Sequence, residues 1–233
     1  QSNEMASGEE PKSCDTPEGM PAHRPRRTKE GDPRGKAQRN FTDPDSRIMK
    51  KNKTYLQGYN GQAAVGMTAQ IIVAYGLTNQ ASDAGNLIPM LNQVESTLGR
   101  RPGGVVADSG YWSSGVVPQA EAMGVEPFIA TGREKQIHEG PAAEGTAPQD
   151  GDELGEMEHK LRTEQGRQRY SRRKGVVEPV FGQIKQGQGF RRFHLRGMEK
   201  ARAEWSLVCT GHNLQKLYKA LGSDSANPKG IGG

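Results

Sequence analysis

The apolar residues of this chain gather in its middle and towards its end, where short apolar runs alternate with polar turns. Residues 59–65 and 70–78 are two such runs, and the tight connection near Gly66 predicts that they pair as an antiparallel hairpin. Upstream of them, residues 43–45 (Asp-Pro-Asp) are a turn signal, and the polar residues that follow predict a loop.

Helical spacing follows the hairpin. Four apolar residues recur on one side of a helix that runs to about residue 98, namely Leu87, Met90, Leu91 and Val94. We expect Ser82 or Asp83 to cap the start of this helix and Gly99 to close its end, because these residue types satisfy the backbone groups left over at helix termini.

A second strand–helix–strand unit comes next. Residues 104–108 form a short apolar run that ends in an acid, which predicts a buried, parallel strand with Asp108 at its carboxyl edge. A helix is expected from Ser113 or Ser114 to residue 123, and another strand at 126–131. The alternation indicates an α/β fold, and Asp108 lies where such sheets usually place their chemistry.

The last third of the chain is expected to be mostly helical. From about residue 153 a helix leads into an apolar face made of Val176, Val177, Val180, Phe181 and Ile184. A final amphipathic helix is predicted to pack on the sheet through Ala203, Leu207, Leu214 and Leu217.

The composition limits how much of the chain can fold, because only 32% of its 233 residues are hydrophobic and 31 are glycines. Residues 1–40 and 222–233 contain almost nothing apolar, so we expect a disordered linker or tail at each end of one domain, 41–221. Within that domain, residues 132–151 are charged and rich in Gly and Pro, which favours a surface loop or insertion.

Charge and cysteine content narrow the class of partner and the compartment. The formal net charge of +5 favours an anionic partner such as nucleic acid. Two cysteines are too few for a disulfide framework or a zinc module. No apolar run is long enough for a transmembrane helix and the first residues are not a secretory signal, so we expect no membrane partner and a cytoplasmic, reducing setting.

One stretch, residues 170–193, carries most of the candidate chemistry, because it sets a single acid, Glu178, among many bases and four aromatic rings. Helical spacing places Glu178, Phe181 or Gly182, and Lys185 on one face. The simplest alternative for each basic residue is a solvated helix face, and for each phenylalanine a place in the core.

Eight blocks in order along residues 37–221 resemble the catalytic domain of DDE-type transposases from bacterial insertion sequences: DPDSRIMK, YNGQAAVG, IIVAYGLTNQASD, ADSGYWS, FIATGR, YSRRKGVVEPVFGQIK, GFRRFHLRG and EWSLVCTGHNLQKL. The resemblance implies a ribonuclease H-like fold, that is, an α/β architecture with a mixed sheet flanked by helices. It also implies an active site in which two aspartates and one glutamate hold two divalent ions, Mg²⁺ or Mn²⁺.

The resemblance assigns Asp108, in ADSGY, and Glu178, in VEPVFGQIK, as catalytic and metal-ligating residues. The first aspartate of the family lies on the first, central strand, upstream of DPDSR. Nothing before residue 40 is strand-like, and Asp15 and Asp32 lie in polar, Pro-rich surroundings. We therefore expect the first aspartate and its central strand to be absent and the fold to be incomplete.

The family also has a Tyr, Arg, Glu, Lys signature around its glutamate. Tyr170 and Arg173 are separated by two residues, and Glu178 and Lys185 by six, as in that signature. Four residues lie between Arg173 and Glu178, where three are usual, so Arg172 or Arg173 fills the arginine position.

The same resemblance implies that the partner is DNA, both transposon ends and target. Phosphate contacts are expected from the signature and from the arginines beyond it: Tyr170, Arg172, Arg173, Lys185, Arg191, Arg192 and Arg196. A second copy of the chain, or a full-length transposase, is a possible protein partner.

The implied function is DNA transposition, with metal-dependent strand cleavage and strand transfer at insertion-sequence ends. Because one bridging carboxylate is expected to be missing, we predict little or no strand transfer by this chain alone. We therefore expect a truncated transposase that is weakly active or inactive on its own. The alternative is a non-catalytic DNA-binding or regulatory remnant of a transposase. A third hypothesis is a chain that does not fold stably, since loss of a central strand leaves unpaired sheet edges.

Overall fold

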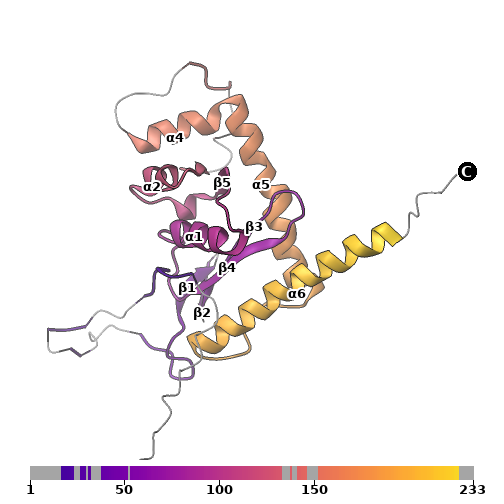
Figure 1. Cartoon of the computed structure of the whole chain (residues 1–233). Coiled ribbons are helices and arrows are strands. Elements are labelled where there is room, and N and C mark those ends of the chain that lie inside the picture. Colours follow the sequence, from indigo (N-terminus) through magenta and orange to yellow (C-terminus); the bar gives the residue numbers. More distant parts are fainter. Residues whose placement is uncertain are drawn as a thin grey trace, which may run out of the picture.

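The computed structural model describes residues 17–23, 27–29, 31–32, 38–51, 53–132, 137, 141–145 and 152–225. Its strands and helices follow the α/β order expected from the sequence (Figure 1). They are β1 (Arg47–Lys51), β2 (Thr54–Gly58), β3 (Asn60–Val65), β4 (Ile72–Thr78), α1 (Leu87–Leu98), β5 (Gly104–Ala107), α2 (Val116–Ala122), β6 (Glu126–Ile129), α4 (Glu153–Arg162), α5 (Glu164–Gly182) and α6 (Met198–Ser225).

The predicted hairpin is confirmed, since β3 pairs with β4 in antiparallel register from Asn60↔Thr78 to Val65↔Ile72. The polar loop predicted before it is wrong. Residues 47–58 instead form a second antiparallel hairpin of β1 with β2. Most side chains of β2 face solvent, and the apolar residues of the two strands are adjacent pairs that do not alternate with polar ones, so no sign of this hairpin is present in the sequence.

The predicted strand at 104–108 is confirmed as β5, which pairs in parallel with β6. The described strands do not form one mixed sheet, however. Among the described residues the strands form three separate two-stranded sheets, β1–β2, β3–β4 and β5–β6. A parallel pair buries little by itself, so α1 and α2 cover β5–β6 through Leu87, Leu91, Val116 and Ala120.

Two predicted helix starts are too early. The α1 helix begins at Leu87 with Asn86 in the N-cap position. Asp83, which was expected to cap it, instead accepts hydrogen bonds from the side chains of Asn60 and Gln62 on β3. The α2 helix begins at Val116, and Gly99 does close α1 in the left-handed conformation, as predicted.

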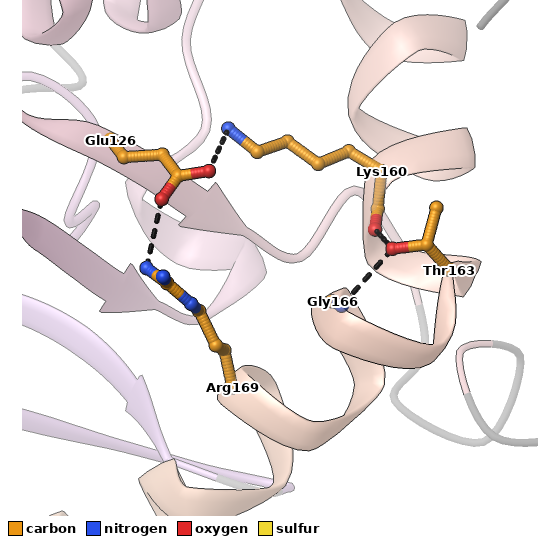
Figure 2. Close-up of polar contacts among 5 residues, drawn as sticks. All are labelled: Glu126, Lys160, Thr163, Gly166 and Arg169. Carbon is orange, nitrogen blue, oxygen red and sulfur yellow. Dashed lines mark hydrogen bonds and ion pairs between the residues drawn. The ribbon is translucent and has the colours of Figure 1, made fainter. Parts of the chain in front are cut away.

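Glu126 of β6 fixes the helices of the last third against the parallel sheet (Figure 2). Its carboxylate lies 3.4 Å from Lys160 Nζ of α4 and 2.8 Å from Arg169 Nη1 of α5. Between the two helices, Thr163 Oγ1 donates to the Lys160 carbonyl and accepts the Gly166 N–H. These contacts set the angle at which α5 leaves α4 and crosses β5 and β6 (Figure 1).

The final helix packs by a different face from the one predicted. The side of α6 that contacts β4 and α5 consists of Ala201, Trp205, Cys209 and His212, all of which are buried. Ala203, Leu207, Leu214 and Leu217, which were expected to face the sheet, are exposed. Both sets have helical spacing, and tertiary hydrogen bonds select the inner one: Trp205 Nε1 donates to the Gln62 carbonyl at 3.0 Å.

The same inner side of α6 also satisfies backbone groups at the edge of β4. Asn213 accepts from the Ile72 N–H at 2.9 Å and donates to the Ile72 carbonyl at 2.8 Å, as a neighbouring strand would. His212 Nε2 lies 2.9 Å from the Gln70 carbonyl, and because a carbonyl only accepts, the ring carries its proton on Nε2. His212 is thus a core histidine.

Parts of the segments expected to be disordered are described and make contacts. Residues 17–23 lie against the end of β4, where the His23 N–H donates to Asn79 Oδ1 at 2.8 Å and Thr78 Oγ1 donates to the Pro21 carbonyl. Ile137, within the predicted surface loop, is buried beside Phe128 and Leu161. Residues 1–16 and 226–233, and most of 132–151, lie outside the described residues.

Candidate functional site

Asp108 lies at the carboxyl end of β5, where the sequence predicted it. Its Oδ1 accepts the Gly110 N–H at 3.0 Å and so caps the short helical turn Ser109–Tyr111. Its Oδ2 lies 3.7 Å from Arg173 Nη1 of α5. The structure therefore brings together one predicted catalytic carboxylate and one predicted phosphate-binding cation.

A polar network that the sequence did not reveal adjoins Asp108. Asp83 Oδ1 accepts from Asn60 Nδ2 and Gln62 Nε2, each at 2.7 Å. The Tyr111 hydroxyl donates to Gln62 Oε1. Burial raises the pKa of Tyr111, and the nearby carboxylates of Asp83 and Asp108 raise it further, so the phenol stays protonated as a donor.

This network joins the β3–β4 sheet to the β5–β6 sheet. Among the described residues, no backbone hydrogen bonds pair a strand of one with a strand of the other. Asn60 and Gln62 are alternate residues of β3 and so project from one face of it, while Tyr111 lies just after β5. Gly110 lies between the two acids: a Cβ there would be 2.8 Å from Asp83 Oδ2 and 3.1 Å from Asp108 Oδ1. A residue with a Cβ at this position would have to displace the Asp83 carboxylate.

Tyr170 and the two candidates for the signature arginine, all near the middle of α5, lie in different environments. Tyr170 is 2% exposed and packs in a cluster with Phe128, Met157 and Leu161, so the structure places it in the core. The Arg173 guanidinium lies 5.6 Å from the centre of the Tyr170 ring, beside Asp108. Arg172 is exposed.

Glu178 and Lys185 are exposed further along the same helical segment. Glu178 is five residues beyond Arg173, which on a helix is about 7.5 Å along the axis and on a different side. Lys185 Nζ lies 5.8 Å from the centre of the Phe181 ring. The pairing of Glu178 with Asp108 in one site stays a prediction.

The two-metal centre that the resemblance implies needs several carboxylate oxygens facing one point. Within the part of the chain that the structure describes, no group of three or more Asp, Glu, His or Cys side chains is placed to hold a metal ion. Asp108 and Glu178 therefore do not fit a complete two-metal centre.

The remaining predicted phosphate ligands, Arg191, Arg192 and Arg196, share one short segment, residues 189–197, which we call the arginine loop. All three are exposed. Gly189 and Gly197 bound the loop with φ of 71° and 84°, a region that side chains with a Cβ rarely adopt. Arg191 Nη2 donates to Gln186 Oε1, a neutral acceptor, at 2.6 Å.

Three carboxylates, one from α6 and two from the segment before β1, accept backbone N–H groups of the arginine loop and of the first residue of α6. Glu204 of α6 accepts the backbone N–H groups of His194 and Leu195 at 3.0 Å, and its Oε1 lies 3.0 Å from His194 Nδ1. At the start of α6, Asp43 accepts the Gly197 N–H and Asp45 accepts the Met198 N–H. Carboxylates are favourable at a helix N-terminus, so these contacts also stabilise α6.

The pKa of Glu204 reflects this role. Burial acts to raise it, but the N–H groups of Leu195 and His194 and the His194 ring outweigh burial and lower it below its usual range. The ionised form is therefore the one that holds the loop. The carboxylates that hold the loop could hardly be predicted from the sequence, because Asp43 lies 154 residues before Gly197, whose N–H it accepts.

Aromatic packing anchors the loop to the core. Phe190 and Phe193 contact each other edge to face, with ring centres 5.2 Å apart, and both lie near Trp205. Phe193 also meets Tyr59 edge to face at 5.7 Å. The two phenylalanines of the loop are therefore partly buried against the core, whereas its three arginines are exposed.

The last third of the chain is similar to a known protein family. Residues 144–218 match a family model described as "Transposase DDE domain". The matched segment contains α5, the arginine loop and most of α6, but not Asp108 or the strands. The search of curated proteins found no match, and neither did the search of solved structures. No helix among the described residues is long and apolar enough to cross a membrane.

Proposed function

We propose that this chain is part of a DDE-type transposase and that it binds DNA through phosphate contacts made by the arginine loop. The match of residues 144–218 to the transposase DDE model supports the family. The observation that carries the DNA-binding role is the loop itself, in which three exposed arginines stand on a backbone fixed by Glu204, Asp43 and Asp45.

Rigidity matters for this function because ordering a flexible backbone on binding costs entropy, and that cost offsets much of the benefit of a phosphate contact. The arginine loop has its backbone N–H groups at 194, 195 and 197 already bonded to carboxylates. The arginines keep their flexible ends in water, which suits contacts to the sugar-phosphate backbone rather than to particular bases.

DNA binding is tested by fluorescence anisotropy with a labelled duplex between about 50 and about 200 mM salt. Changing Arg191, Arg192 and Arg196 to Ala together should weaken binding and reduce the slope of log affinity against log salt by roughly 0.9 for each phosphate that the loop no longer neutralises. The control changes three exposed bases elsewhere, Lys53, Arg100 and Lys219, to Ala and so matches the net charge. Equal losses of affinity in the two variants would refute a role specific to the loop.

For catalysis, we propose that Asp108 and Glu178 supply two of three carboxylates and that this chain alone cleaves DNA weakly or not at all. Among the described residues no group of three or more Asp, Glu, His or Cys side chains is placed to hold a metal ion, and Asp108 Oδ2 lies 3.7 Å from Arg173 Nη1 instead. A complete centre of this kind would hold Mg²⁺ or Mn²⁺ through three carboxylates, of which this chain would supply two. A plasmid-nicking assay with either ion tests this: robust nicking that Asp108→Ala abolishes would refute it.

The second candidate function is a non-catalytic DNA-binding or regulatory role. The Asp108–Arg173 ion pair favours it, because a guanidinium beside the carboxylate competes with a divalent ion for the same oxygen. Salt-dependent DNA binding without metal-dependent cleavage would support this candidate over the catalytic one.

A further inference from the structure

The last helix, α6, has two apolar faces, and only one of them is covered by the described residues. The inner face packs through Ala201, Trp205 and Cys209. On the opposite side, Leu207 is 72% exposed, Leu214 59%, Leu217 54% and Tyr218 79%. A helix that is apolar on two sides is usually buried on both, so the outer face is a candidate contact surface.

The spacing of these residues indicates what covers the face. Leu207, Leu214 and Leu221 are seven residues apart, and Leu217 lies three beyond Leu214. With these three leucines at position a of a heptad, Leu217 is at one d position and Thr210 at the other, so four of the five a and d positions are leucine, a pattern by which one helix pairs with another in a coiled coil. At 100° per residue the set occupies an arc of about 100°, which lies opposite the inner face. We call Leu207, Leu214, Leu217, Tyr218 and Leu221 the outer seam.

The outer seam is also accessible from the side. Figure 1 shows α6 (yellow) leaving the body of the molecule, so that its second half extends beyond the sheets and the other helices. The inner side of α6 still reaches the β3–β4 hairpin at Lys216, whose Nζ donates to Gln70 Oε1. A second helix could therefore lie along the seam without displacing any packed element.

We propose that the outer seam is a dimer interface and that its occupant is the outer seam of a second copy of this chain. Two copies of a chain with net charge +5 repel each other, so a self-pairing surface must keep like charges out of the contact. The positions that flank the seam, Gly211, Asn213 and Ala220, carry no charge. A two-fold interface of this kind is self-complementary by construction.

The area of the outer seam sets the expected affinity of the dimer. The exposed apolar surface of its residues amounts to roughly 500 Å² per copy, at the upper end for a single patch on a monomer. Two copies together bury about 1,000 Å², near the lower limit for a specific interface. The dimer should therefore be weak, with a dissociation constant in roughly the micromolar range.

Sedimentation equilibrium of the full chain tests the proposal over about 1 to about 100 µM protein. The wild-type chain should pass from monomer to dimer across this range. Leu214→Lys with Leu217→Lys should weaken dimerisation at least about tenfold, because like charges would face each other in the seam. The control is Leu98→Lys, at an exposed leucine of α1 that lies outside the seam.

Disulfide trapping locates the contact. Leu214 is the middle leucine of the seam, so it meets its own copy whether the helices run parallel or antiparallel. Leu214→Cys should give a covalent dimer on oxidation, and Lys219→Cys, on another side of α6, should not. Cys14 is replaced by Ser in both, and Cys209 is buried with its pKa raised to about 12, so it stays protonated and unreactive.

Three results would overturn the proposal. The first is a wild-type chain that stays monomeric at the highest concentration, which would mean that something other than a second copy covers the seam. The second is a dimer that survives the double Lys substitution, and the third is equal trapping through residues 214 and 219. Dimerisation is measured without DNA, so these outcomes are independent of the proposed DNA binding.

Discussion

The first half of α5 and the arginine loop were both predicted to present cations to DNA, yet they differ in the structure. In α5, Tyr170 is buried and the side chain of Arg173 is 14% exposed beside Asp108. In the loop, Arg191, Arg192 and Arg196 all face solvent. Burial, which the sequence does not state, therefore decides whether a basic residue stabilises the fold or is open to a partner.

Tyr170, which most clearly belongs to the fold, should show the largest loss of stability when it is changed. Tyr170→Ala removes a fully buried ring from the cluster with Phe128 and Leu161, so the free energy of unfolding should fall by about 3–5 kcal/mol. Tyr55→Ala is the matched control, because Tyr55 is exposed on β2 and its loss should cost within about 0.5 kcal/mol. Urea denaturation measures both, and a similar loss in the two variants would contradict the assignment.

A substitution of Glu204, which supports the arginine loop, should cause the second largest loss of stability. Glu204→Gln keeps the shape but removes the charge that accepts the N–H groups of His194 and Leu195, so the free energy of unfolding should fall by about 1–3 kcal/mol. Trypsin should then cut faster after Arg191 and Arg192. Glu121→Gln, at an exposed glutamate of α2, is the control and should change neither property.

The pH dependence of stability follows from the lowered pKa of Glu204. Its contribution is fully present above the unfolded value of about 4.5 and is lost as pH falls through the lower folded value. The wild-type chain should therefore lose more stability on acidification below about pH 4.5 than Glu204→Gln does. Thermal melts at several pH values measure this. Parallel acid curves for the two proteins would contradict it.

Local signals predicted much of the fold. Three elements each follow from a pattern within a few residues. The β3–β4 hairpin follows from two apolar runs around a tight turn, the end of α1 from the left-handed Gly99, and β5 from a short apolar run. The β1–β2 hairpin was missed because its apolar residues come in adjacent pairs, Ile48-Met49 and Tyr55-Leu56, and not in alternation, so there is no period-two pattern to find.

Contacts between distant segments could not be predicted. Both faces of α6 have helical spacing, and only the hydrogen bonds of Trp205 and Asn213 to strand backbones select the inner one. The site shows the same limit. Asp108 was found from its place after a strand, whereas Asp83 and Glu204 carry no local sign of the partners that they meet in the folded chain.

Arg173 should show the smallest effect, and it separates the two regions most sharply. Arg173→Gln removes the ion pair with a half-exposed Asp108 and the stacking over Tyr170, which together should cost about 1 kcal/mol. Arg172→Gln, at the exposed neighbour, should cost nothing measurable.

The salt dependence of DNA binding should separate the two regions. Its slope should stay unchanged in Arg173→Gln, because so little of the Arg173 side chain is open to a phosphate. Substitution of each loop arginine should reduce the slope and leave stability unchanged. A slope that falls by roughly one with Arg173→Gln would instead place Arg173 on the DNA, as the signature predicts, and α5 and the loop would then differ only in degree.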